Sequence, residues 1–295
     1  MLSWVRTGVR NKLWRLWIVA LFSLGMAGPD AVWANDEMSW LVYYSDKAPV
    51  GAFKNHSLLV LDSRYHPPLR PLADRGKTLL GYLSLGEVAS DADWYEEMRQ
   101  QGILGAENPA WPGSFYVDLR DPRWVKRVVE ELVPSIVKRG FQGVFLDTLD
   151  NAGHLERLDP KKYHGMVEAG ARLVRTIRRH YPYLVIMINR GYELVPLVGD
   201  QIDMLTGESV YARHDASSSG YARVVEKDYL WQVKQLKKAK KRHPRLKIFS
   251  LDYWNPDDAA GLREIYRIQR QNGFSPYVSV PKLDRIVIEP KEGSR

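Results

Sequence analysis

Asp147 ends a short apolar run, Val144 to Leu146, that follows a turn bracketed by Gly140 and Gly143. A run of this kind is typical of a strand buried on both faces of a parallel sheet. A carboxylate at the last position of such a strand is where α/β proteins place groups that do chemistry. A single Asp there more often caps the next helix. The prediction therefore depends on whether other strands end in the same way.

Several other expected strands also end in polar or aromatic side chains. Short apolar runs predict further strands at residues 40–44, 58–62, 78–85, 184–189, 202–206, 246–251 and 275–280. The side chains at or just after the strand ends are Tyr43, Tyr44, Asp62, Tyr82, Glu87, Asp147, Asp150, Asn189, Arg190, Glu208, Asp252, Tyr253 and Trp254. If the strands are parallel neighbours, these groups meet on one rim.

Helices are expected to connect most of these strands. The pairs Asp121-Pro122, Asp159-Pro160 and Asn255-Pro256 each combine an N-cap residue with proline at the first helical position. Eight strands with helical crossovers in about 250 residues predict an α/β fold, a single-domain (β/α)8 TIM-type barrel over residues 35–295. An open doubly wound sheet is the alternative. No glycine-rich phosphate fingerprint follows the first strand, which argues against nucleotide binding.

A rim that carries several carboxylates must bind a metal, handle protons or bind a cation. A metal is the weaker explanation because no histidine falls at a strand end and cysteine is absent, so we expect neither a metal nor a cofactor. No serine completes a Gly-x-Ser-x-Gly motif. A pair of carboxylates that cleaves a glycosidic bond needs only what is present, and exposed aromatic rings at the rim would then support sugar rings.

Three motifs together resemble one enzyme family. Tyr-Leu-Ser-Leu-Gly-Glu (82–87), Gly-Phe-Gln-Gly-Val-Phe-Leu-Asp (140–147) and the strand that ends in Glu208 are similar to the endo-α-1,4-polygalactosaminidases, glycoside-hydrolase family 114. The resemblance covers about residues 38–285. It implies a (β/α)8 barrel that cuts α-1,4-linked galactosamine polymers, with Asp147 and Glu208 as the catalytic pair. The tail after Val280 is shorter than a complete last helix, which leaves closure of the barrel open.

For the mechanism we predict Asp147 as the nucleophile and Glu208 as the general acid/base, with retention of configuration; the roles could be exchanged. Retention requires carboxyl groups about 5–5.5 Å apart, whereas about 6.5–9.5 Å predicts inversion. The acid needs a raised pKa, which we expect for Glu208 from burial and neighbouring acids. The remaining rim residues are expected to bind substrate. The carboxylates of Asp62, Glu87, Asp150 and Asp252 would attract a cationic amino sugar, although the chain as a whole is basic.

The N-terminus predicts export. Basic residues at 6, 10, 12 and 15 precede an apolar run at residues 16–24, and small residues before Ala34 suggest cleavage after it, so residues 1–34 are expected to be a signal peptide. We expect a secreted or periplasmic monomer with no stable membrane insertion after cleavage. The lysine-rich stretch 234–247 is most simply a solvated helix face, and nucleic acid is not an expected partner. Residues 211–221 could form a lid over the site or an ordinary loop.

Two other functions fit the same residues. One is a carbohydrate-binding barrel without activity that helps to produce an exopolysaccharide. The other is a barrel hydrolase for a different α-linked sugar. The presence of both candidate catalytic carboxylates favours an enzyme.

Overall fold

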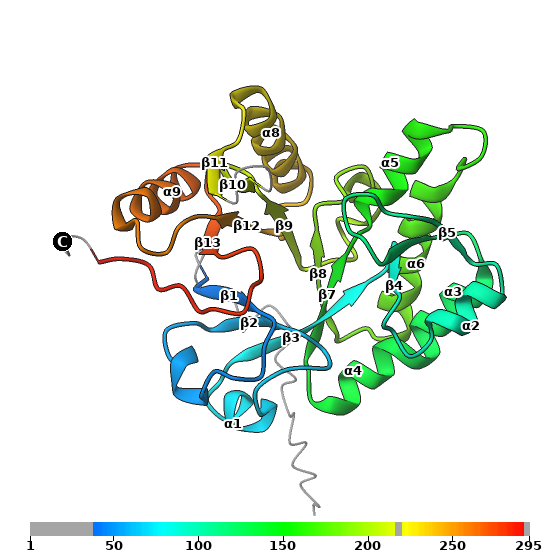
Figure 1. The fold of residues 1–295 in the computed structure, drawn as a ribbon, viewed down its shortest axis with the longest axis horizontal. Coiled ribbons are helices and arrows are strands. Elements are labelled where there is room, and N and C mark those ends of the chain that lie inside the picture. The colour runs from blue at the N-terminus through cyan, green and yellow to red at the C-terminus, as the bar shows by residue number, and fades with distance from the viewer. Residues whose placement is uncertain (1–37, 216–219, 292–295) are drawn as a thin grey trace, which may run out of the picture. The chain divides into compact units, whose positions relative to one another are not determined.

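Eight parallel strands form the centre of the protein in a computed structural model that describes residues 38–215 and 220–291 (Figure 1). The expected signal peptide and its cleavage site lie outside the described residues. The strands neighbour one another in the order β1, β2, β3, β7, β8, β9, β12, β13. Their bounds are β1 Trp40–Tyr43, β2 Leu58–Leu61, β3 Thr78–Ser84, β7 Gly143–Asp147, β8 Val185–Asn189, β9 Met204–Glu208, β12 Lys247–Tyr253 and β13 Ser275–Ser279. These strands form a nearly closed barrel, which confirms the predicted (β/α)8 fold.

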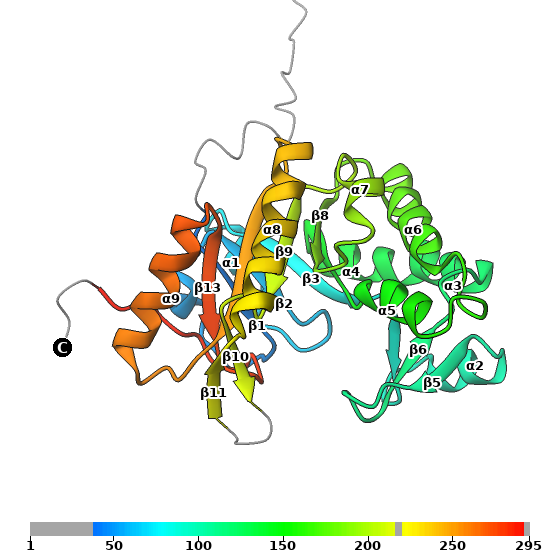
Figure 2. The same cartoon turned by 90° about the horizontal axis from the view of Figure 1, so that it is seen from above.

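Helices surround the strands (Figures 1 and 2). They are α1 Leu69–Ala73, α3 Pro122–Arg127, α4 Val133–Arg139, α5 Asp150–Leu158, α6 Met166–His180, α7 Val195–Val198, α8 Glu226–Arg242 and α9 Ala259–Gln271, with a 3₁₀ turn at Val50–Phe53 between β1 and β2. A π-helical turn, Val128–Leu132, separates α3 from α4, which has Pro134 in its first turn. Proline has no N–H for the preceding turn, and the wider π turn accommodates that loss.

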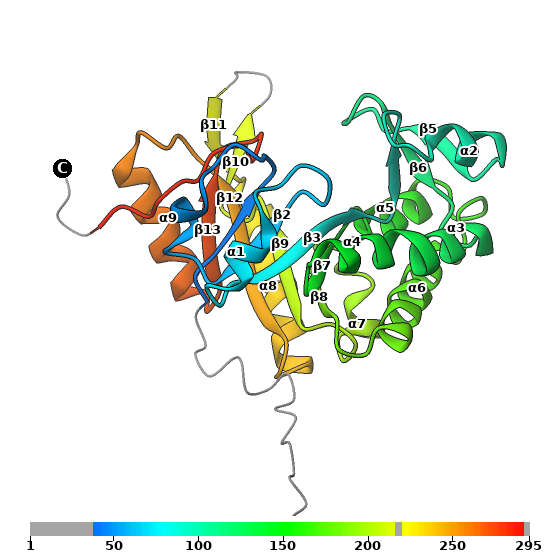
Figure 3. The same cartoon turned by 90° about the horizontal axis from the view of Figure 1, so that it is seen from below.

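Two additions project from the end of the barrel at which the strands finish (Figures 2 and 3). After β3, the chain forms a three-stranded sheet of β4 (Glu87–Ala89), β6 (Ser114–Val117) and β5 (Leu104–Glu107), with α2 (Tyr95–Gln100) between β4 and β5. After β9, the strands β10 (Ala212–Asp215) and β11 (Gly220–Arg223) form an antiparallel hairpin. The described residues of this segment therefore form two paired strands, where a lid or an ordinary loop was expected over residues 211–221.

Aromatic side chains fill the barrel interior below that end. The Trp40 ring lies 5.1 Å from Phe249 and 6.0 Å from Tyr277, measured between ring centroids, and all three side chains are buried. This apolar floor excludes water from the barrel axis.

The seam between β13 and β1 has no ladder of backbone hydrogen bonds and is closed by other contacts. The Trp40 indole donates to the Ser275 carbonyl at 3.0 Å. The tail after β13 runs past β1 without forming a helix in the described residues, and the Tyr44 N–H donates to the Leu283 carbonyl at 2.7 Å. Leu283 and Val287 are buried, so an extended tail packs where an eighth helix would be.

Candidate active site

Three consecutive strands of the barrel end in a polar side chain: β7 in Asp147, β8 in Asn189 and β9 in Glu208. The next residue in each case has a positive φ without being glycine, at 64° for Thr148, 54° for Arg190 and 50° for Ser209. Such φ values strain ordinary residues and are concentrated at functional sites. The repeated left-handed turn ends each strand at its polar residue.

A single side-chain amide bridges the two carboxylates. The Asn189 Nδ2 lies 3.0 Å from Asp147 Oδ1 and 2.6 Å from Glu208 Oε2, and it can donate one hydrogen to each. The two facing oxygens are therefore no further apart than these two distances combined, so the two carboxyl groups lie side by side. Asn189 is 3% exposed, and its Oδ1 has no hydrogen-bond partner.

Tyrosines surround the pair. The Tyr82 hydroxyl donates to Asp147 Oδ2 at 3.0 Å, and the Tyr253 hydroxyl donates to Glu208 Oε1 at 2.5 Å. The Tyr44 ring packs edge-on against Tyr82 at 5.1 Å. Burial raises the pKa of all three phenols well above 10.0, and the nearby carboxylates raise it further. All three phenols therefore remain neutral, and Tyr82 and Tyr253 act as donors to the carboxylates.

Burial also changes the titration of the pair. It raises the pKa of Asp147 to about 6, and the charge of Glu208 adds to the rise, whereas the hydrogen bonds from Asn189, Thr148 and Tyr82 oppose it. Asp147 therefore keeps a proton in weakly acidic solution. A protonated carboxyl group beside a second carboxyl group is the state that acid-assisted glycosidic cleavage requires.

A second carboxylate and a cation lie beside Asp147. Asp150, at the start of α5, lies 3.5 Å from the Arg190 guanidinium, and the two side chains are 32% and 44% exposed. Burial raises the pKa of Asp150, the Arg190 charge lowers it, and the Asp147 charge raises it. The contact joins the loops after β7 and β8 at the open side of the site.

The motif 82–87 holds the loop that carries Asp147. The Leu85 N–H donates to the Asp147 carbonyl at 3.0 Å, and the Gly86 N–H donates to Thr148 Oγ1 at 2.8 Å. At the end of the motif, Glu87 Oε1 accepts from the Asn151 side chain at 2.5 Å. The motif thus supports the segment that carries Asp147, and Thr148 is a supporting residue that the sequence did not indicate.

Gly86→Ala is expected to destabilise the protein and to displace Asp147. A Cβ atom at residue 86 would lie 2.2 Å from the Thr148 carbonyl oxygen, which is backbone and cannot rotate away. Overpacking of this kind costs about 1–3 kcal/mol. The unfolding temperature and kcat should both fall. Gly51→Ala is the matched control, because its Cβ would have no neighbour within 4 Å; equal unfolding temperatures for the two variants would contradict the contact.

Two predicted rim residues point away from the site. Tyr43 is 2% exposed and packs on Phe53 outside the barrel, at 5.6 Å between rings. Asp252 is 0% exposed and accepts hydrogen bonds from the N–H groups of Tyr211 and Ala212 and from the Gln269 side chain. Successive strand residues face opposite sides, so Tyr44 and Tyr253 face the site while their neighbours do not. The structure therefore places Tyr43 and Asp252 away from the site at which they were expected to bind substrate.

Glu87, Trp254 and Asp62 also have partners of their own. Glu87 is 5% exposed, and protein donors occupy both of its carboxylate oxygens, so it supports the site without facing substrate. Trp254 donates to Asp258 at 2.9 Å and stacks under the Arg223 guanidinium at 4.2 Å, in a cluster outside the barrel. Asp62 accepts the N–H groups of residues 64 and 65 in the turn after β2.

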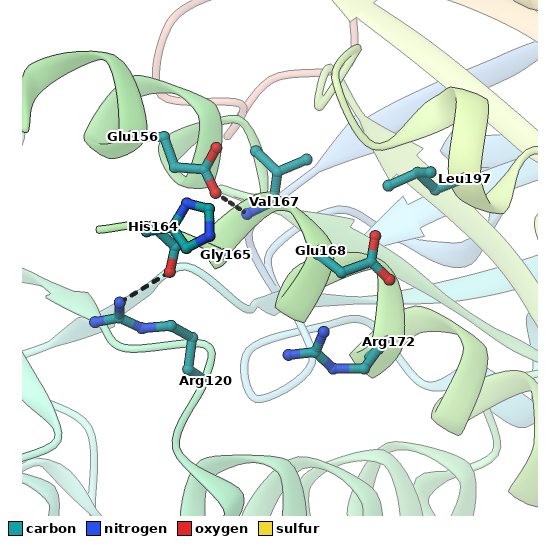
Figure 4. Close-up of a pocket in the computed structure, with 8 residues that line it drawn as sticks. All are labelled: Arg120, Glu156, His164, Gly165, Val167, Glu168, Arg172 and Leu197. Carbon is teal, nitrogen blue, oxygen red and sulfur yellow. Dashed lines mark hydrogen bonds between the residues drawn. The ribbon is translucent and has the colours of Figure 1, made fainter. Parts of the chain in front are cut away.

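Two surface cavities lie away from the pair. One, of about 560 Å³, is lined by Arg120, Glu156, His164, Gly165, Val167, Glu168, Arg172 and Leu197 near the start of α6 (Figure 4). There Glu156 accepts the Val167 N–H and Arg120 donates to the His164 carbonyl, so protein groups already use these side chains. The other, of about 820 Å³, lies between α9 and the tail. Neither is lined by Asp147, Asn189 or Glu208.

Within residues 38–215 and 220–291, no group of three or more His, Asp or Glu side chains is placed to hold a metal ion. Over the same residues, no helix combines the length and the apolar character needed to cross a membrane.

A family model, a relative by sequence and two solved structures are similar to this chain. The model of glycoside-hydrolase family GH114 matches residues 25–295. An uncharacterized protein of Methanocaldococcus jannaschii is 25% identical over 262 residues, which are 79% of this chain and 72% of that protein. The glycoside hydrolase domain of PelA from Pseudomonas aeruginosa aligns with a TM-score of 0.75 and 27% identity, over 85% of this chain and 98% of the domain. Ega3 of Aspergillus fumigatus, solved in complex with galactosamine, aligns with a TM-score of 0.64 over 84% of this chain and 93% of Ega3. The two sequences are 12% identical, so this likeness shows a shared fold alone.

Proposed function

Because the chain belongs to glycoside-hydrolase family GH114, we propose that it is an exported enzyme that cleaves α-1,4-linked galactosamine polymers within the chain and retains the anomeric configuration. The observation that carries the proposal is the Asn189 amide between Asp147 and Glu208, which holds the two carboxylates beside each other. The choice of sugar follows from the resemblance of residues 82–87 and 140–147 to the polygalactosaminidases.

In the first step, the Asp147 carboxylate attacks the anomeric carbon while the Glu208 carboxyl group protonates the departing glycosidic oxygen. A glycosyl ester with Asp147 results. Glu208, now a carboxylate, then removes a proton from a water molecule that attacks the same carbon and releases Asp147. Tyr82 and Asn189 hold the Asp147 carboxylate throughout, and Tyr253 orients Glu208.

The charge around the pair suits an amino sugar. Asp147, Glu208 and Asp150 carry the acidic groups of the site, and Arg190 is paired with Asp150. Deacetylated galactosamine carries an ammonium group, which a local cluster of carboxylates attracts even on a basic protein. The exchanged order, with Asp147 as the acid, is favoured by one observation: burial raises the pKa of Asp147 to about 6.

Activity is expected to fall as the pH rises through about 6. Cleavage needs one proton on the pair, and the raised pKa of Asp147 indicates that this proton is lost near pH 6. The acidic form is thus the active one, and kcat/KM, measured between pH 4 and 9, should decline on the alkaline side. Asp150→Asn is the control, because its own raised pKa could cause a similar decline. A profile that stays level to pH 9 would contradict the assignment.

The function itself is tested with partially deacetylated α-1,4-galactosamine polymer, a fully acetylated polymer and other α-linked polysaccharides. We expect the protein to shorten the deacetylated polymer. Polymer that is bound but left intact would instead indicate a carbohydrate-binding barrel, and cleavage of another polymer alone would indicate a different hydrolase. Export predicts that the protein recovered outside the cytoplasm begins at Asn35.

A further inference from the structure

Trp111 is unusually exposed for a tryptophan. Its side chain belongs to the loop between β5 and β6, which projects at the end of the barrel where the strands finish (Figure 3), and the residue is 68% exposed. Large aromatic side chains usually bury most of their surface, and a fixed exposed ring favours a binding role. The neighbouring loop after β2 is joined to the same sheet by the Arg64–Asp91 ion pair, at 3.7 Å.

The loop that carries Trp111 is held in place. The Trp111 N–H donates to the Asn108 carbonyl, and the Trp111 carbonyl accepts from the Ser114 N–H, each at 3.0 Å. The side chains of Asn108 and Ser114 donate to the two oxygens of Glu87 at 2.7 and 2.5 Å. Exposure of the ring is therefore not explained by a loose loop.

The same buried carboxylate connects this loop to the catalytic strand. Glu87 also accepts from Asn151, in the first turn of α5 and four residues after Asp147. The β5–β6 loop is thus attached to the segment that positions the nucleophile. A ring carried on a backbone that is held in place loses less freedom when a ligand binds than a ring on a loose loop.

We propose that Trp111 is a platform for an amino-sugar unit of the polymer at a distance from the cleaved bond. This inference rests on the proposed function. The indole face packs against the apolar C–H face of a pyranose ring, and it attracts the ammonium group of deacetylated galactosamine because tryptophan is the strongest cation–π partner. Trp111 thereby contributes to recognition of a long, deacetylated chain, while the carboxylate pair acts on the bond.

Trp111→Ala tests the platform with two substrates. One is a deacetylated polymer, and the other is an aryl α-galactosaminide, which reaches only the catalytic pair. We expect KM for the polymer to rise about 2- to 30-fold. We expect kcat and KM for the aryl substrate to stay unchanged. Trp111→Phe should restore much of the polymer affinity. The matched control is Tyr183→Ala, because Tyr183 is 84% exposed but precedes β8, at the other end of the barrel.

The outcomes separate the two proposals. An unchanged polymer KM in Trp111→Ala, with an active wild-type enzyme, overturns the platform and leaves the function intact. Equal losses on the polymer and on the aryl substrate also overturn it, because they indicate a structural role. A wild-type protein that cleaves no galactosamine polymer overturns both.

Discussion

Asp147→Asn and Glu208→Gln are each expected to abolish most cleavage of the polymer while leaving the barrel folded. Loss of a positioned general acid lowers kcat by about 10²- to 10⁴-fold, and loss of the nucleophile should lower it at least as much. Both substitutions preserve size and some hydrogen-bonding capacity. The assay is kcat on the polymer, with thermal unfolding to confirm the fold.

The control for this pair is Asp252→Asn. Asp252 is also a buried carboxylate on a barrel strand, but it faces outward and accepts backbone N–H groups. Its substitution should lower stability and leave kcat within a few-fold of the wild type. Near-normal activity in Asp147→Asn or Glu208→Gln would refute the catalytic pair.

The two substitutions also order the catalytic roles. An aryl substrate with an acidic leaving group needs little protonation, so Glu208→Gln should lose much less activity on it than on the polymer if Glu208 is the acid. Asp147→Asn should lose activity on both substrates. The reverse pattern would exchange the roles.

Asn189→Ala is expected to lower kcat by about 10- to 150-fold. The substitution removes hydrogen bonds to two charged groups, and such bonds contribute about 1.5–3 kcal/mol. It also leaves two buried carboxylates facing each other without the donor that lowers the pKa of Asp147. The alkaline limb of the kcat/KM profile should therefore move to higher pH.

A purely structural role for Asn189 would not move that limb. The measurement is a pH profile of the variant alongside the wild type, at a temperature where both are folded. If the variant keeps wild-type kcat and an unshifted limb, the amide does not organise the pair.

The meeting of Asp147 and Glu208 could be predicted from the sequence because the ends of the strands can be recognised in it. Asp147 and Glu208 each close a short apolar run, and parallel strands bring such ends together. The same reasoning failed for Tyr43 and Asp252, since it counted every polar residue near a strand end. The two-residue alternation of a strand allows only one of two adjacent side chains to face the site.

Other features depend on contacts between distant segments, which spacing alone does not reveal. Gly86 must be glycine because the Thr148 carbonyl approaches it from another strand. Glu87 resembled a rim carboxylate because the sequence does not show that donors from β6 and α5 surround it. The sequence indicates that the tail after Val280 is too short for a complete last helix. It does not show that this tail packs beside β1.

The most direct test of the account is the configuration of the sugar at the newly formed reducing end, followed by proton NMR as the wild-type enzyme cleaves α-1,4-galactosamine polymer. The account predicts that the α-anomer forms first and then equilibrates with the β-anomer, because one carboxylate attacks and water replaces it. Initial release of the β-anomer, or no cleavage of the polymer at all, would contradict it.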